Sequence, residues 1–213
     1  MSRSTRLWLV LVLNLGLVGA LIAVGILARS LGVLAAGADY LADAAAIGVS
    51  LVAIWLSSRP PTPSRPNGFL KATTWAAFFN AGSLLVVSML VILAAVVRLL
   101  TGSHVVHGLP VLIASGVAAV AMLGGALILG GDEDDDRDRG GSLNMKAVLL
   151  DTLADSAIAG AVAVVGAIIL VTGGNYWLDP VVALVMSGVI AFHALLLVLK
   201  VLTELKASNP TKI

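Results

Sequence analysis

The sequence predicts an all-α integral membrane protein with six transmembrane helices. The 213 residues are 59% hydrophobic and only 12% charged, whereas soluble domains are about one quarter charged. The apolar residues gather in runs that each reach the roughly 20 residues needed to cross a hydrocarbon core. These runs occupy nearly the whole chain, so we expect one transmembrane domain over residues 1–206 and no soluble domain at either end.

The predicted spans follow one another through short connections, which favour antiparallel neighbours. The first run is predicted to be a transmembrane helix and not a cleaved signal peptide. It is longer than the apolar core of a signal peptide, and Arg29 follows it instead of a small-residue cleavage site. The six spans cover residues 7–28, 31–56, 73–97, 110–130, 145–172 and 178–202.

Local composition predicts where the chain leaves the membrane. Residues 59–68 contain several prolines, which remove backbone donors and break helices. Residues 131–141 hold six acids against two arginines and predict an acidic cytoplasmic loop. Glycines at 173–174 interrupt the chain before the last span, where Asp179 and Pro180 are typical of a helix start.

The basic residues predict the orientation. Loops on the cytoplasmic side carry an excess of Lys and Arg, and a cytoplasmic N-terminus would leave only Arg29 and Arg98 on the opposite side. Both termini should therefore be cytoplasmic. The other eleven of the 13 basic residues then share the cytoplasmic side: Arg3, Arg6, Arg59, Arg65, Lys71, Arg137, Arg139, Lys146, Lys200, Lys206 and Lys212.

Two short motifs place acids inside apolar spans. Residues 39–45 read DYLADAA and residues 151–157 read DTLADSA. The i,i+4 spacing puts both aspartates of each motif on one helix face. At 1.5 Å per residue, Asp43 and Asp155 lie roughly 15–18 Å from one end of their spans, near the middle of a core about 30 Å thick. If the second and fifth spans face each other, four carboxylates converge: Asp39, Asp43, Asp151 and Asp155.

Carboxylates in the middle of a membrane need compensation. Each costs about 2.5–3.5 kcal/mol at a helix centre, so four that are ionised and lipid-facing would cost on the order of 10 kcal/mol. Ion pairing with intramembrane Lys or Arg is excluded by the sequence, because every basic residue lies at or beyond a predicted span end. A protonated carboxyl that hydrogen-bonds between helices explains one Asp, whereas two matched pairs favour a site that holds a cation and protons in alternation.

Such a site suits a divalent metal ion. Carboxylate oxygens ligate divalent metals, and four monodentate oxygens can form a tetrahedron. Crowded carboxylates in a low dielectric hold protons when no cation is bound, and metal binding releases those protons. Alternate exposure of the site would then exchange metal for protons. The alternative that uses the same residues is a passive cation channel or proton pore.

With these motifs the chain resembles the cation diffusion facilitator family over nearly its whole length. SLGVLAAGADYLADAAA at 30–46 looks like the family's second helix and NMKAVLLDTLADSAIAG at 144–160 like its fifth, each with an Asp/His-x-x-x-Asp pair. FFNAGSLL at 78–85 is similar to the third helix, and WLDPVVAL at 177–184 to the start of the sixth.

The resemblance implies a metal/proton antiporter and no enzyme, so neither catalytic residues nor a cofactor are expected. It implies export of divalent transition metals, usually by a homodimer, through a transport site formed by Asp39, Asp43, Asp151 and Asp155. The membrane would be a bacterial inner membrane. The net charge of +1 gives no indication of nucleic-acid binding, and the absence of cysteine excludes thiolate ligands and disulfides.

Departures from the family pattern change what we expect. Family members usually continue into a cytoplasmic metal-binding domain, whereas here a short tail at 207–213 follows the last span, so we expect a form without that domain. Arg65 stands where the family often has a His, so no second metal site is predicted there. The loop at 131–141 is acidic instead of His-rich. This loop is either an ordinary solvated run of charges, or its negative field concentrates cytoplasmic metal ions near the entrance to the transport site.

The sequence leaves the transported metal open. Zinc-carrying members commonly have a His in at least one pair, and members with Asp-x-x-x-Asp on the fifth helix include manganese carriers. All-oxygen ligands favour harder ions such as Mn²⁺ or Fe²⁺, but affinity runs Zn²⁺ above Mn²⁺. Zinc and cadmium are also the commoner family substrates. We therefore favour Zn²⁺ or Cd²⁺, with Mn²⁺ or Fe²⁺ as the alternative.

The remaining chemistry-bearing residues have ordinary explanations. His104 and His107 are expected to be exposed loop residues, and His193 a hydrogen-bonded packing residue. An intramembrane aspartyl protease is excluded because its Gly-x-Gly-Asp signature is absent from the sequence.

Overall fold

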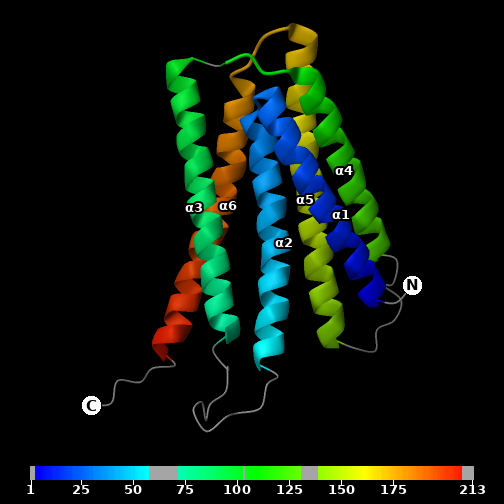
Figure 1. Ribbon diagram of the computed structural model, residues 1–213, viewed down its shortest axis with the longest axis vertical. Coiled ribbons are helices and arrows are strands. Elements are labelled where there is room, and N and C mark those ends of the chain that lie inside the picture. The colour runs from blue at the N-terminus through cyan, green and yellow to red at the C-terminus, as the bar shows by residue number, and fades with distance from the viewer. Residues whose placement is uncertain (1–2, 58–71, 103, 131–138, 208–213) are drawn as a thin grey trace.

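A computed structural model of the chain describes residues 3–57, 72–102, 104–130 and 139–207. The regular structure in these ranges is entirely helical, which confirms the predicted all-α fold class. Figure 1 shows an up-and-down bundle in which the start of α1 and the end of α6 lie at the same end. The helices are α1 (Arg3–Ala28), α2 (Leu31–Ser57), α3 (Ala72–Thr101), α4 (Gly108–Gly130), α5 (Arg139–Thr172) and α6 (Leu178–Ala207).

Two helix boundaries differ from the predicted spans in ways that matter. α3 continues to Thr101, so Arg98 belongs to its last turn instead of lying beyond it. α5 begins at Arg139, so the predicted loop over 131–141 is wrong for residues 139–141. An apolar run marks only the part of a helix that lies in lipid, and polar residues can continue the helix past it. The predicted tail over 207–213 is wrong at its first residue, because α6 ends at Ala207. The other predicted loop and tail residues lie outside the described ranges: 59–68, 131–138 and 208–213.

Long apolar helices make this a multi-pass membrane protein. Many large apolar side chains face outward, such as Leu93 on α3 and Val189 on α6, and are exposed in the single chain. Within the part of α1 whose side chains the structure describes, the apolar stretch is Leu15–Ala28. Six crossings and the cytoplasmic position of the termini therefore stay predictions. Four stretches among the described residues are long and apolar enough to cross a membrane: Ala77–Thr101, Gly108–Leu127, Thr152–Thr172 and Leu178–Thr203.

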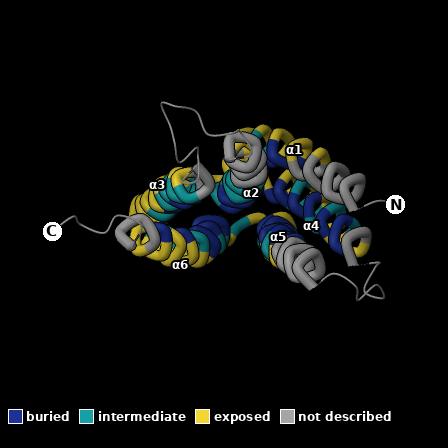
Figure 2. The backbone as a smooth tube through the Cα atoms, turned by 90° about the horizontal axis from the view of Figure 1, so that it is seen from below, coloured by how far each residue is buried: buried dark blue, intermediate teal, exposed yellow. Residues whose placement is uncertain are grey.

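The six helices form two groups. α3 and α6 pack along each other, while α1, α2, α4 and α5 form a second group in which α4 packs on α5 and α1 contacts both α2 and α4. α2 also contacts α3 and α6, so it joins the two groups. Figure 2 views the bundle from below and shows the α3–α6 pair beside the other four helices, with buried residues turned inward.

Small residues allow close packing inside the four-helix group. Gly108 on α4 and Gly166 on α5 lie so close that a Cβ atom on Gly166 would be 2.6 Å from the backbone nitrogen of Leu112. Such small-residue contacts are the usual way in which helices associate in lipid, where apolar side chains gain little by leaving it. The contact fixes the position of α5, which carries one of the two aspartate motifs.

One buried polar cluster ties the two groups together at the end opposite the termini. Asp179, in the first turn of α6, is fully buried. Its carboxylate accepts hydrogen bonds from the backbone nitrogens of Leu31 at 2.7 Å and Gly32 at 3.2 Å, which helix geometry leaves without a partner inside α2. Arg98 of α3 forms an ion pair with the same carboxylate at 3.1 Å, and Ser30 donates its hydroxyl to it. We call these residues the Asp179 cluster: Ser30, Leu31, Gly32, Arg98 and Asp179.

Candidate metal site

The first aspartate pair lies on α2 among small residues. Asp39 and Asp43 are roughly 12 and 18 Å along the helix from Leu31, and both are half-buried. α2 contains no Lys or Arg, and alanines fill much of the helix around the two acids. Alanine has the highest helix propensity, and its small side chain leaves room beside the carboxylates. The pair therefore sits on a regular helix at a depth fixed by the Asp179 cluster.

The second pair lies on α5 and is turned toward the interior. Asp155 is 6% exposed, and Thr152, one position after Asp151, is buried as well. Asp151 itself is helical, but its side chain lies outside the described residues. The next residue fixes α5 laterally, because Ser156 Oγ donates to the backbone oxygen of Ala119 on α4 at 2.9 Å. Asp155 thus faces protein and not lipid.

Tyr40 joins the two pairs. Its side chain is fully buried, and its hydroxyl donates to the backbone oxygen of Asp155 at 3.2 Å. Asp39 directly precedes Tyr40 on α2 and Asp43 follows it by three positions, so this bond brings the first aspartate pair beside the helix that carries Asp155. The bond places the two motifs at the same depth, as the sequence predicted if the second and fifth helices faced each other.

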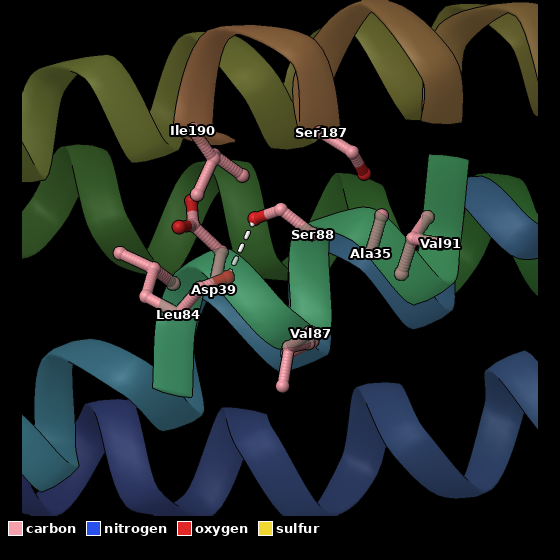
Figure 3. Close-up of a pocket in the computed structure, with 9 residues that line it drawn as sticks. Ala35, Asp39, Leu84, Val87, Ser88, Val91, Ser187 and Ile190 are labelled. Atoms are coloured by element: carbon pink, nitrogen blue, oxygen red, sulfur yellow. Dashed lines mark hydrogen bonds between the residues drawn. The ribbon is translucent and has the colours of Figure 1, made fainter. Parts of the chain in front are cut away.

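Asp39 also borders a small cavity between α2, α3 and α6. The cavity has a volume of about 10 Å³, on the order of what one water molecule requires. Figure 3 shows the Asp39 carboxylate extending toward Ile190 of α6, with Ser88 of α3 beside it. Ser88 donates its hydroxyl to the backbone oxygen of Leu84 at 2.8 Å, so this wall is held by a helix-internal bond. The cavity is lined by Ala35, Ala38, Asp39, Leu84, Val87, Ser88, Val91, Ser187 and Ile190.

The described side chains include no group of three or more His, Asp or Glu placed to hold a metal ion. Asp39, Asp43 and Asp155 therefore do not form a three-ligand cage in the described structure. Because the side chain of Asp151 lies outside the described part, the convergence of all four carboxylates stays a prediction.

The histidines lie away from this centre. His104 and His107 are exposed, as expected for loop residues at the end opposite the termini. His193 on α6 is also exposed, with its ring 6.0 Å from that of Phe192. The expectation of a packed residue at 193 is thus wrong for the single chain.

The sequence did not identify the roles of two buried residues, Tyr40 and Asp179. Tyr40 stands at one of the two positions where the motifs differ, opposite Thr152, and that difference was the available signal. Asp179 was predicted only as a helix start, which α6 confirms. Its partners come from α2 and α3, and no local pattern in the sequence identifies them.

The chain is similar to known metal transporters over most of its length. The family model of the cation efflux transmembrane domain matches residues 7–205. The zinc transporter ZitB of Yersinia pseudotuberculosis is 33% identical over 190 residues, which are 89% of this chain and 58% of that protein. ZitB of Escherichia coli K12 is 32% identical over the same shares.

A mammalian relative shows the same partial coverage. The proton-coupled zinc antiporter SLC30A2 of Mus musculus is 28% identical over 194 residues, which are 87% of this chain and 52% of that protein. The chain spans a little more than half the length of the curated relatives it matches.

Proposed function

The chain belongs to the cation efflux family of metal transporters, and from this premise we propose that it moves Zn²⁺ across a membrane in exchange for protons. The observation that carries the proposal is the meeting of the two aspartate motifs at Tyr40, whose hydroxyl bonds to Asp155 on the opposite helix. Acidic residues at the same depth on two membrane helices are costly, and such residues typically mark a pathway for cations or protons.

We propose Asp39, Asp43, Asp151 and Asp155 as the ligands of the transported ion. The bond from Tyr40 to the backbone of Asp155 brings the helices of the two pairs together, and Asp151 lies one turn before Asp155 on α5. Like charges repel when no cation lies between them, and a divalent ion reverses that balance. The carboxylates would therefore draw together on binding, through side-chain rotation or a small shift of α5 against α2.

Zinc is the first choice of ion for two independent reasons. The bacterial and mammalian relatives carry zinc in their names, and carboxylate oxygens bind Zn²⁺ at about 2.0–2.2 Å in tetrahedral sites. Cd²⁺ follows as an ion of the same charge. Mn²⁺ and Fe²⁺ remain competitors because the proposed ligands are all oxygen.

Proton coupling follows from the same carboxylates. Ligating carboxylates must be deprotonated, so ion binding releases protons that the empty site holds. The name of the SLC30A2 relative, a proton-coupled antiporter, supports this coupling. Protons returning from the opposite side would displace the ion and reset the site.

We further propose export from the cytoplasm, with both termini cytoplasmic, across a bacterial inner membrane. The basic-residue bias and the bacterial relatives support this placement. A homodimer is proposed from the family resemblance alone, and cross-linking in membranes would test it.

The proposal is tested by metal flux in proteoliposomes with an imposed pH gradient. Zn²⁺, Cd²⁺, Mn²⁺ and Fe²⁺ are compared in the wild type and in Asp155→Asn, which keeps the size of the side chain. Glu204→Gln, near the end of α6, is the matched control for loss of one acid. We expect zinc flux that depends on the pH gradient, is lost in Asp155→Asn and persists in Glu204→Gln.

Three other outcomes would contradict the proposal. Flux that ignores the gradient would indicate a passive channel. Preferred flux of Mn²⁺ or Fe²⁺ would reject zinc as the cargo. Flux in Asp155→Asn equal to that of the wild type would show that Asp155 is not part of the transport site.

A further inference from the structure

The Asp179 cluster connects the two helix groups in an unusual way. Asp179 and Arg98 both belong to the α3–α6 pair, and every other bond they make in the cluster reaches the connection between α1 and α2. Arg98 donates to the backbone oxygen of Arg29 at 2.8 Å, and Asp179 receives the amides of Leu31 and Gly32. The α1–α2 turn is shaped for this contact, because Arg29 adopts a left-handed conformation with φ 55°.

The cluster is closely fitted as well as charged. A Cβ atom on Gly32 would lie 3.2 Å from the Asp179 carboxylate and 3.1 Å from the side chain of Val182, so a larger residue at 32 would push α6 away by a few tenths of an ångström. Charge-assisted hydrogen bonds of this kind are about twice as strong as neutral ones. If the two charged groups separate, each must be hydrated to offset the cost of leaving its partner. We therefore expect two states of this contact: one in which the ion pair is formed, and one in which water fills the space between the helices.

The position of the cluster relates it to Asp39. The three helices that meet in the cluster, α2, α3 and α6, are the same three that line the small cavity beside Asp39. Ser187 lines that cavity on α6, eight residues or roughly 12 Å below Asp179 along the helix. Ala35 on α2 is one turn below Leu31 and lies between the cluster and Asp39. The cluster thus lies at the end of the α2–α3–α6 contact that faces away from the termini, and the cavity beside Asp39 lies deeper along the same contact.

We propose that the Arg98–Asp179 ion pair, seated on the first turn of α2, is the gate through which the transported ion passes between the site and the face opposite the termini. In the described structure the gate is closed. It opens when the α3–α6 pair moves away from the N-terminus of α2, which exposes Ser187 and then Asp39 to water from that face. This inference rests on the proposed transport function for its purpose, but its geometry stands without it.

The gate is tested by the water accessibility of Ser187. The protein contains no cysteine, so Ser187→Cys provides a single, nearly isosteric thiol at a position that is 1% exposed. A membrane-impermeant methanethiosulfonate reagent is added to intact cells and, separately, to inverted vesicles, which present opposite faces. The labelling rate is then compared with and without Arg98→Gln.

We expect Arg98→Gln to accelerate labelling at least about tenfold, the effect of moving the closed–open equilibrium by one decade, and only from the cluster face. Lys200→Gln, which removes an exposed cation at the other end of α6, should leave the rate unchanged. Two milder variants, Arg98→Lys and Ser30→Ala, should give smaller accelerations and serve if Arg98→Gln does not fold, as judged by its gel-filtration profile.

The outcomes separate the gate from the transport function. Equal labelling in the parent and in the folded gate variants, or acceleration from the face of the termini, would overturn the gate even if zinc flux is intact. Faster labelling from the cluster face in a protein that moves no metal would support the gate and reject the proposed function.

Discussion

Asp179 and Asp155 are both buried acids in a membrane protein, yet their surroundings differ. Asp179 lies in the first turn of α6. Its carboxylate pairs with the guanidinium of Arg98 and accepts hydrogen bonds from the hydroxyl of Ser30 and from two backbone amides at the start of α2. Asp155 stands in the middle of α5, where neighbouring backbone amides are already bonded within the helix. The only basic residues on α5 are Arg139 and Lys146, more than two turns away.

The difference indicates two uses for a buried carboxylate. A carboxylate at a helix start can bind the amides that a neighbouring helix start leaves unpaired, and here an arginine as well. A carboxylate in mid-helix stands where the backbone amides of its own helix are already bonded to carbonyl oxygens one turn earlier. Asp179 is therefore suited to holding helices together, and Asp155 to exchanging partners.

The strongest test of this contrast is the loss of function without loss of fold. We expect Asp155→Asn to reduce gradient-driven zinc flux by about 100-fold or more, equivalent to roughly 2.7 kcal/mol, while thermal unfolding in detergent changes little. A large fall in unfolding temperature with normal flux would reverse the roles assigned to the two acids.

The opposite variant should damage the fold. Asp179→Ala leaves Arg98 without its counter-charge, and removing one partner of a buried pair costs about 3–5 kcal/mol. Asp179→Asn is the matched control, since its amide oxygen still accepts from the α2 backbone and should cost less. Denaturant or thermal unfolding measures both, and an Asp179→Ala protein as stable as wild type would show that the cluster does not hold the helices together.

A third variant tests the support behind Asp155. Gly166→Ala places a Cβ atom against the backbone of Leu112 at 2.6 Å, and overpacking of this kind costs about 1–3 kcal/mol. Gly160→Ala, on the same helix with open space around it, should be neutral or slightly stabilising. Equal stability of the two variants would mean that the α4–α5 contact is looser than described.

The smallest expected effect belongs to Tyr40. Tyr40→Phe keeps the ring but removes the hydrogen bond to the backbone of Asp155, for a cost of about 1 kcal/mol in stability. Because the bond aligns α2 with α5, zinc flux should also slow by a few-fold, and a KM and maximal-rate analysis would locate the loss. Unchanged flux and stability would show that only the packing of the Tyr40 ring matters and that its hydroxyl does not.

Much of the fold could be predicted because apolar runs and helix breakers are local signals. Every predicted span corresponds to a helix, and the Asp179–Pro180 start of α6 is where the sequence indicated. The start of α5 was placed too late because its first residues are polar, and lipid-facing hydrophobicity says nothing about a helix that extends into water.

The candidate site could be predicted only in part. The i,i+4 spacing put Asp39 and Asp43 on one face, but the bond from Tyr40 to Asp155 joins residues 115 positions apart. Arg98 was placed beyond the membrane because the apolar run ends at residue 97. One further helical turn brings it onto Asp179, so the ion pair that the sequence excluded for the site aspartates exists at a different acid.

Proton release during zinc binding to the purified protein tests whether the aspartates exchange metal for protons. Zn²⁺ is titrated into weakly buffered protein with a pH-sensitive dye, and bound zinc is measured in the same samples. We expect protons to be released in proportion to bound zinc, and Asp155→Asn to reduce both. Zinc binding without proton release, or release that Asp155→Asn leaves unchanged, would contradict this exchange.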